Sequence, residues 1–312
     1  MGVKILILGL MSGYLYFTLQ QKEQGLQQVL VLLRQNLSAN HFLELSLVVL
    51  LTPLNWTCEA LKWQTLAQKI ETVSFKKALG GVLTGLTLGF FLPNNVGDAA
   101  GRIWSLGQSG RNAGVGAALL SNGLQFYVSL LFGTLAWTVL IAQQSDLQTV
   151  FNQILLALLT ATLLFGVWLL LKRQAAEQYL ARFCWFRWLE PYVRVIATYT
   201  PRELQRAFGW AALRYAVFSL QFWLLLQIFG VSLPVSSALT GIFLVFFAKT
   251  LIPAINFLGD LGIREASSLY FFSFFTTEPA PIVATTLTLW FVNILVPVLV
   301  GMAWLLRRSR SE

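Results

Sequence analysis

The chain has 312 residues, of which 56% are hydrophobic and 11% are charged, and its formal net charge is +9. Soluble domains carry about 25% charged residues, so this composition excludes an ordinary soluble domain and predicts an integral membrane protein. The single histidine, His41, excludes zinc sites built from several histidines and Ser-His-Asp triads, and we expect neither a metal site nor a cofactor.

Six apolar segments are long enough to cross a bilayer as helices, which takes about 20 residues. In chain order they are residues 3–20, 41–61, 114–141, 150–171, 208–230 and 281–305. The first resembles a signal peptide, but it lacks a small-x-small cleavage site and further spans follow it, so we expect a retained helix.

Two other apolar stretches, 76–93 and 235–252, each end at a proline and continue into a polar segment. This pattern predicts discontinuous or re-entrant helices. The expected fold is an all-α polytopic integral membrane protein, one domain over 1–312, with about six transmembrane helices plus two re-entrant or broken-helix hairpins. A chain with eight full spans is the alternative.

Basic residues are concentrated in some connections and missing from others. They occur in 62–77, in 172–207 and in the C-terminal tail, whereas the connections near 142–149, 231–234 and 276–280 contain no Lys or Arg. Because cytoplasmic loops are rich in Lys and Arg, we expect both termini to be cytoplasmic. The basic connection 172–207 also holds Trp185, Phe186 and Trp188, which predicts an amphipathic segment on the anionic inner leaflet rather than a nucleic-acid site.

The two broken stretches share one motif. In both, Ala-Leu-x-Gly stands before a proline (Pro93 or Pro253), and N-x-x-G-D-x-x-x-R follows it. The matched residues are Asn94, Gly97, Asp98 and Arg102 in the first copy, and Asn256, Gly259, Asp260 and Arg264 in the second. An ordered match of Pro, Asn, Gly-Asp and Arg indicates an internal duplication. Three predicted spans separate the copies, so the hairpins should enter from opposite faces as an inverted repeat, with halves at 41–141 and 208–305.

The residue types of the motif suggest two roles. Proline frees backbone groups at membrane depth, glycine allows a sharp turn or close approach of a ligand, and asparagine can cap the next half-helix. An Asp and an Arg four residues apart share one helix face and can neutralise each other. These pairs could be structural staples, or the arginines could hold a phosphate or other anionic headgroup, because charges inside a membrane usually mark a site. Further candidates are Lys249 and Glu265 near the second copy, and Glu59, Lys62 and Arg214 elsewhere.

With these residues in place, the chain resembles, over nearly its whole length, the flippase-like transmembrane domain of lysylphosphatidylglycerol synthases and of many stand-alone bacterial and archaeal proteins. The likeness rests on three stretches: Glu59-x-x-Lys62-Trp63, Leu92-Pro93-x-x-x-Gly97-Asp98 with Arg102, and Pro253 followed by Gly259-Asp260-Leu261-Gly262-Ile263-Arg264-Glu265. The resemblance implies a translocase that moves a charged phospholipid or lipid-linked headgroup between leaflets of a bacterial or archaeal cytoplasmic membrane. Membrane lipids would be its partners, and a partner synthase or a homo-oligomer is left open.

Other functions are also compatible with the residues. A secondary transporter of a small anionic solute could use the same architecture. An intramembrane lipid-modifying enzyme usually presents paired Asp-rich Mg²⁺ motifs or a histidine site, and neither is seen here, so we do not expect an enzyme. No aminoacyl-transfer domain follows the last span, so we do not expect this chain alone to transfer lysine.

Overall fold

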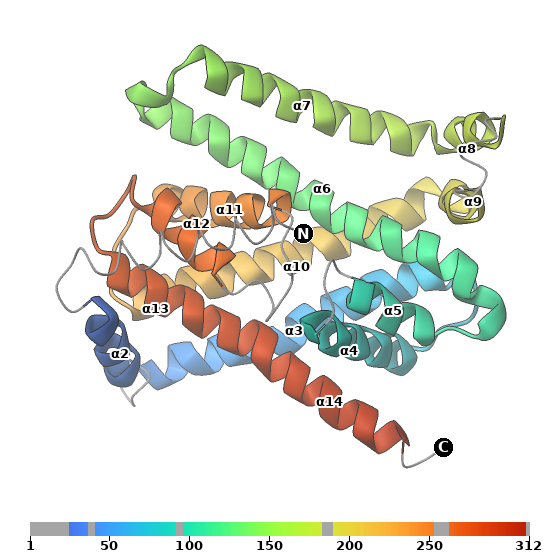
Figure 1. Ribbon diagram of the computed structural model, residues 1–312, viewed down its shortest axis with the longest axis horizontal. Coiled ribbons are helices and arrows are strands. Elements are labelled where there is room, and N and C mark those ends of the chain that lie inside the picture. The colour runs from blue at the N-terminus through green and yellow to red at the C-terminus, as the bar shows by residue number, and fades with distance from the viewer. Residues whose placement is uncertain (1–24, 37–40, 92–95, 183–189, 253–261, 310–312) are drawn as a thin grey trace.

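A computed structural model describes residues 25–36, 41–91, 96–182, 190–252 and 262–309. All regular structure in these ranges is helical (Figure 1), which confirms the predicted all-α membrane fold. The α-helices are α2 (Gly25–Asn36), α3 (Phe42–Ala67), α4 (Phe75–Phe91), α5 (Val96–Trp104), α6 (Arg111–Gln143), α7 (Val150–Leu171), α8 (Arg173–Arg182), α9 (Glu190–Thr198), α10 (Pro201–Ile228), α11 (Val235–Leu251), α12 (Ile263–Phe272), α13 (Pro279–Trp290) and α14 (Val296–Ser309). Short 3₁₀ turns, η2 (Gln108–Gly110) and η3 (Ser145–Leu147), flank α6, and the π-helical turn η5 (Phe291–Leu295) joins α13 to α14.

Four of the predicted spans are helices long and apolar enough to cross a membrane. In the described part of the chain they are Gln108–Gln143, Val150–Leu171, Pro201–Ile228 and Pro279–Leu306. The predicted 41–61 span is the 26-residue helix α3, and the predicted 3–20 span lies outside the described residues. Also outside them are Pro93, Asn94, Pro253, Asn256, Gly259 and Asp260 of the motif, and Trp185, Phe186 and Trp188 of the basic connection.

Two helix boundaries differ from the sequence-based expectation. The sequence assigns residues 62–77 to a connection, but α3 continues to Ala67 because residues 61–67 contain neither glycine nor proline. Lys62 is 1% exposed. Helix α10 begins earlier than expected, at Pro201, because Thr200 and Glu203 form a capping box there. The last part of the predicted 172–207 connection, from residue 201 onward, therefore forms about the first two turns of a long helix.

The long helices run along one another, and their connections gather at two opposite ends (Figure 1). At one end lie the connection between α3 and α4, helices α8 and α9, and the end of α14. At the other end lie the connections that follow α6, α10 and α12. The basic connections are thus grouped at the first end and the basic-free ones at the second, which is the arrangement expected of helices that cross a membrane.

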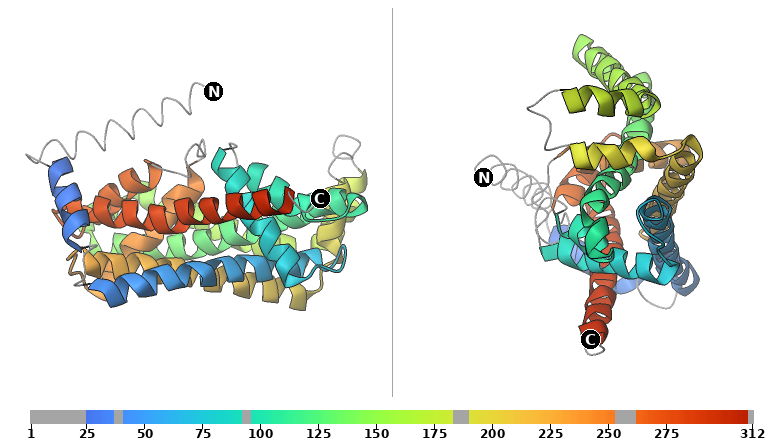
Figure 2. Two further views of the ribbon diagram at one scale, coloured as in Figure 1. Left: turned by 90° about the horizontal axis from the view of Figure 1, so that it is seen from below. Right: turned by 90° about the vertical axis from the view of Figure 1, so that its right-hand side faces the viewer.

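Helix α7 is the least buried of the long helices. It packs beside α6, and only Asn152, Leu159 and Leu163 along it are buried. Figure 2 shows α7 and α8 projecting beyond the rest of the body. Since α7 is almost entirely apolar, its exposed faces suit contact with lipid chains rather than with water.

Each predicted break separates two helices that pack on each other. Helices α4 and α5 form one such pair and α11 and α12 the other. The first pair starts and returns at the basic end of the molecule, and the second does so at the opposite end (Figure 1). The broken-helix prediction is therefore confirmed for both stretches.

Glycines let the paired helices approach closely. A Cβ atom on Gly101 of α5 would collide with the backbone of Gly85 on α4, and one on Gly97 would collide with the backbone of Leu88. The glycines of the shared Ala-Leu-x-Gly element are used alike in both pairs, because Gly81 lies against Ser105 and Gly241 against Phe272, each close to the end of the returning helix. In this structure Gly97 serves helix packing, and contact with a ligand stays a prediction.

At the basic end, Glu71 joins two connections. It accepts hydrogen bonds from Lys77 Nζ at 2.7 Å and from the Gly107 N–H at 2.9 Å. The bond from Lys77, together with the weaker effect of the Gly107 N–H, lowers the pKa of Glu71 below its ordinary value. A carboxyl group of this kind stabilises the fold when it is ionised.

We expect Glu71→Gln to lower the thermal unfolding midpoint of the detergent-purified protein at neutral pH. Because the folded pKa is depressed, the contribution is complete above the pKa of the unfolded chain and is lost as the pH falls through the folded value. The difference in thermal unfolding midpoint between wild type and Glu71→Gln should therefore become smaller as the pH is lowered from neutral into the acidic range. A gap that stays constant over that range would show that ionisation of Glu71 does not contribute.

Candidate functional site

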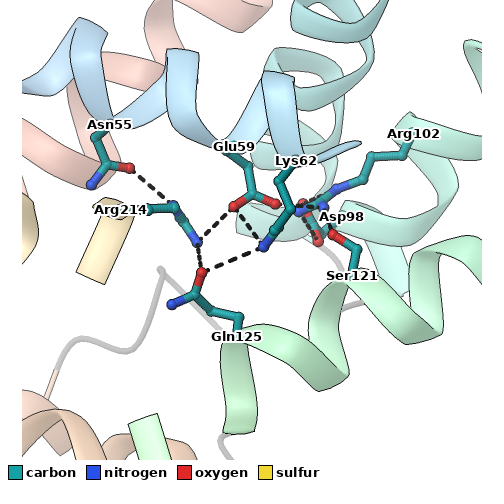
Figure 3. A network of polar contacts seen from close by, with 8 residues as sticks. All are labelled: Asn55, Glu59, Lys62, Asp98, Arg102, Ser121, Gln125 and Arg214. Carbon is teal, nitrogen blue, oxygen red and sulfur yellow. Dashed lines mark hydrogen bonds and ion pairs between the residues drawn. The ribbon is translucent and has the colours of Figure 1, made fainter. Parts of the chain in front are cut away.

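The polar centre of the molecule is built on one face of α3. Asn55, Glu59 and Lys62 follow one another at helical spacing, and all three are buried. Helices α5, α6 and α10 bring their own polar side chains to this face (Figure 3). Buried charges in a protein interior need ion-pair and hydrogen-bond partners, and here the partners come from α3 itself and from three other helices.

Glu59 is the acceptor at the middle of this network. Its Oε1 lies 2.6 Å from Arg102 Nη1, and its Oε2 lies 2.9 Å from Lys62 Nζ and 3.0 Å from Arg214 Nη1 (Figure 3). The side chain is 2% exposed. One buried carboxylate thus holds cations from α3, α5 and α10 together.

Arg102 is fully engaged in the described part of the network. Its guanidinium meets Asp98 through Nε and Nη2, with Nη2 at 2.8 and 2.7 Å from the two carboxylate oxygens. Its Nη1 donates to Ser121 Oγ at 2.9 Å, in addition to the ion pair with Glu59. The four-residue spacing of Asp98 and Arg102 therefore forms the ion pair on one helix face that the sequence predicts.

Arg214 could have reached toward membrane headgroups, and the structure places it in the network instead. Its Nε donates to Asn55 Oδ1 at 3.0 Å, and its guanidinium lies over the ring of Phe218. Gln125 Oε1 of α6 accepts from both Arg214 Nη1 and Lys62 Nζ at 3.4 Å. The three cations Lys62, Arg102 and Arg214 thus face two carboxylates, those of Glu59 and Asp98.

A cavity of about 560 Å³ opens beside this network. Both broken-helix pairs line it: Asp98 and Arg102 from the first, and Lys249 and Arg264 from the second. Lys62 and Arg214 line it as well, so the side chains predicted from separate parts of the sequence meet at one cavity. Its other lining residues are Gly85, Leu86, Gly89, Phe90, Asn122, Gln125, Phe126, Ser129, Tyr215, Phe218, Phe246, Thr250, Ile252, Asn293, Ile294 and Val298.

The second arginine of the motif is bound differently from the first. Arg264 is 3% exposed, and its ion pair in the described structure is a 3.6 Å contact from Nε to Oε1 of Glu265. Its Nε and Nη2 have no hydrogen-bond partner among the described residues. Glu265 uses its other oxygen to accept from the Gly262 N–H at 2.6 Å, which caps α12 at a glycine with φ of +94°. Arg264 thus belongs to the cavity lining and has donors without a partner among the described residues, whereas every donor of Arg102 is engaged.

Several cavity residues were not singled out from the sequence. Gln125, Ser121 and Asn293 all take part in the site or line it, and each stands inside an apolar span. Polar side chains in the middle of a transmembrane helix are costly, and this signal could have found them. Groups of three or more His, Cys, Asp or Glu that could hold a metal ion are absent from the described residues.

The helical body, the apolar helices and the cavity lined by buried charged side chains together define a polytopic membrane protein with an internal polar site. The chain belongs to the family of the lysylphosphatidylglycerol synthase transmembrane region, whose family model matches residues 3–301. No curated protein was found to match the chain. Membership in this family gives the protein a membrane-associated, lipid-related role.

Proposed function

We propose that this protein moves the charged headgroup of an anionic phospholipid or lipid-linked molecule between the two leaflets of its membrane. The observation that carries the proposal is Arg264, a buried guanidinium that lines the cavity and retains unpaired donors in the described structure. Planar guanidinium groups bind phosphate and carboxylate through two parallel hydrogen bonds. An anionic headgroup would supply acceptors for the donors of Arg264 that have no partner among the described residues.

The charge around the cavity supports an anionic ligand. Near the first motif, Lys62, Arg102 and Arg214 outnumber the carboxylates of Glu59 and Asp98 that pair with them. An excess of positive charge attracts anions, most strongly where little water screens it.

The apolar part of the lining supports a lipid over a free ion. Phe90, Phe126, Phe218 and Phe246 line the cavity together with aliphatic side chains, and they share it with the cations. A small hydrated anion gains nothing from contact with these rings. A lipid can place its headgroup among the cations and the start of its acyl chains against the rings.

The arrangement of the two helix pairs supports movement rather than static binding. Because α4/α5 returns to the basic end and α11/α12 to the other, the pairs suit the two halves of an inverted repeat around one site. Alternate opening of such halves would expose the cavity first to one leaflet and then to the other. On this proposal the bound headgroup is moved without chemical change.

The test is lipid exchange in reconstituted liposomes. Tail-labelled fluorescent lipids with anionic, zwitterionic or polyprenyl-phosphate headgroups are incorporated, and a membrane-impermeant reductant bleaches the outer leaflet. Liposomes with the protein should lose almost all fluorescence of at least one anionic lipid, whereas protein-free liposomes should lose only the outer-leaflet share. Absence of exchange for every lipid would contradict the proposal, and uptake of a small anion instead would favour a secondary transporter.

A further inference from the structure

A second buried polar side chain of the cavity lining, that of Asn293, has no hydrogen-bond partner among the described residues. Asn293 is 6% exposed, and among the described residues neither its Nδ2 nor its Oδ1 has a hydrogen-bond partner. It belongs to the same cavity lining as Arg264. A buried amide without partners is rare in proteins, because its donors and acceptors lose their bonds to water and gain none in return.

The backbone around Asn293 departs from an ordinary α-helix. The residues from Phe291 to Leu295 form a π-helical turn in the middle of the long Pro279–Leu306 helix. Pro297 has no N–H to donate to the carbonyl four residues earlier, which is that of Asn293, and the helix widens there. Single π-helical turns inside α-helices are frequent at functional sites.

We propose that Asn293 is a specificity-determining residue that binds a hydroxyl-bearing group next to the phosphate of the headgroup. The inference rests on the proposed function and names the class of lipid that the cavity selects. An amide offers both a donor and an acceptor, and a hydroxyl needs both. Arg264 would hold the anionic oxygens, and Asn293 would distinguish a glycerol or sugar substituent from an alkyl one.

Two lipids of equal charge isolate the contribution of the headgroup hydroxyls to binding. Phosphatidylglycerol and phosphatidylmethanol both carry one phosphodiester charge, but only the glycerol headgroup has hydroxyls. Wild-type protein should bind short-chain phosphatidylglycerol about tenfold more tightly than phosphatidylmethanol, since losing one well-placed pair of hydrogen bonds in a buried site corresponds to a factor of this size. In Asn293→Leu the two affinities should become equal, through weaker binding of phosphatidylglycerol.

A matched control uses the same substitution at another buried asparagine. Asn152 of α7 donates to the Leu147 carbonyl at 2.8 Å and does not belong to the cavity lining. Asn152→Leu should keep the wild-type preference. If Asn293→Leu is not monodisperse in detergent, Asn293→Ala serves in its place, because it removes the amide without adding bulk.

The outcomes separate this inference from the proposed function. Equal affinity of wild type for both lipids, or a preference that persists in Asn293→Leu and Asn293→Ala, overturns the role of Asn293 even when lipid exchange is observed. If no lipid is exchanged but the glycerol preference is found and is lost in the variants, translocation fails and the hydroxyl-binding site stands. If neither lipid binds, the role of Asn293 is wrong, and the exchange assay with the other lipids decides the proposed function.

Discussion

Replacing Arg264 with glutamine is expected to reduce lipid exchange by about 10- to 100-fold, because charge-assisted hydrogen bonds to an anion contribute about 1.5–3 kcal/mol. The fold should survive this change. Arg264 is buried and makes one long ion pair in the described structure. Replacing it therefore removes a buried charge that is incompletely paired and breaks few stabilising contacts. The liposome assay measures the exchange rate, and the thermal unfolding midpoint in detergent measures the stability.

Two variants control for the loss of charge. Arg264→Lys keeps the positive charge but not the planar pair of donors, and we expect it to recover only part of the rate. Arg202→Gln removes an exposed arginine near the start of α10 and should leave exchange unchanged. A normal exchange rate in Arg264→Gln would show that this guanidinium does not hold the headgroup.

Replacing Glu59 with glutamine is expected to cause a large loss of stability, unlike the replacement of Arg264. Three cations lie within 3.0 Å of its carboxylate, and a neutral amide would leave them facing one another in a buried site. Removing one partner of a buried ion pair typically costs about 3–5 kcal/mol, so the purified variant should unfold at a much lower denaturant concentration or fail to accumulate.

A control on the same helix and a second-site change make this prediction specific. Glu44→Gln changes an exposed glutamate in the first turn of α3 and should shift the free energy of unfolding by less than about 0.5 kcal/mol. Adding Lys62→Met to Glu59→Gln removes one of the uncompensated cations and should restore part of the stability. Equal stability of Glu59→Gln and Glu44→Gln would contradict the role assigned to Glu59.

The two copies of the motif thus differ in how their arginines are used. In the first copy, all donors of Arg102 are bound by Asp98, Glu59 and Ser121, which fits the structural interpretation. In the second copy, Arg264 has donors without a partner among the described residues, which fits the functional interpretation. On our proposal, the first copy holds the helices together and the second binds the headgroup. The paired effects of Glu59→Gln and Arg264→Gln test this division directly.

Much of the architecture was predictable because it depends on local patterns. Apolar runs of sufficient length predict spans, and a proline followed by Asn and Gly-Asp predicts a break, so α4/α5 and α11/α12 were expected as broken helices. The spacing of Asp98 and Arg102 predicts their ion pair, because residues four apart share a helix face. The helix boundary near Lys62 differs from the prediction because a charged residue after an apolar run resembles a helix end. One partner of Lys62, Glu59, lies three residues earlier, but the other, Gln125, lies far away in sequence.

By itself, the sequence determined the membrane setting, the helices and the repeated pattern of charged residues, since each depends on neighbours within a few turns. Only the tertiary structure decided that Glu59 gathers Lys62, Arg102 and Arg214, and that Arg264 and Asn293 share a cavity with them. The physical reason is that a buried charge takes its partners from whichever helices pack beside it. Packing between helices distant in sequence is set by shape and close contact, such as that of Gly101 with Gly85, and no local pattern encodes it.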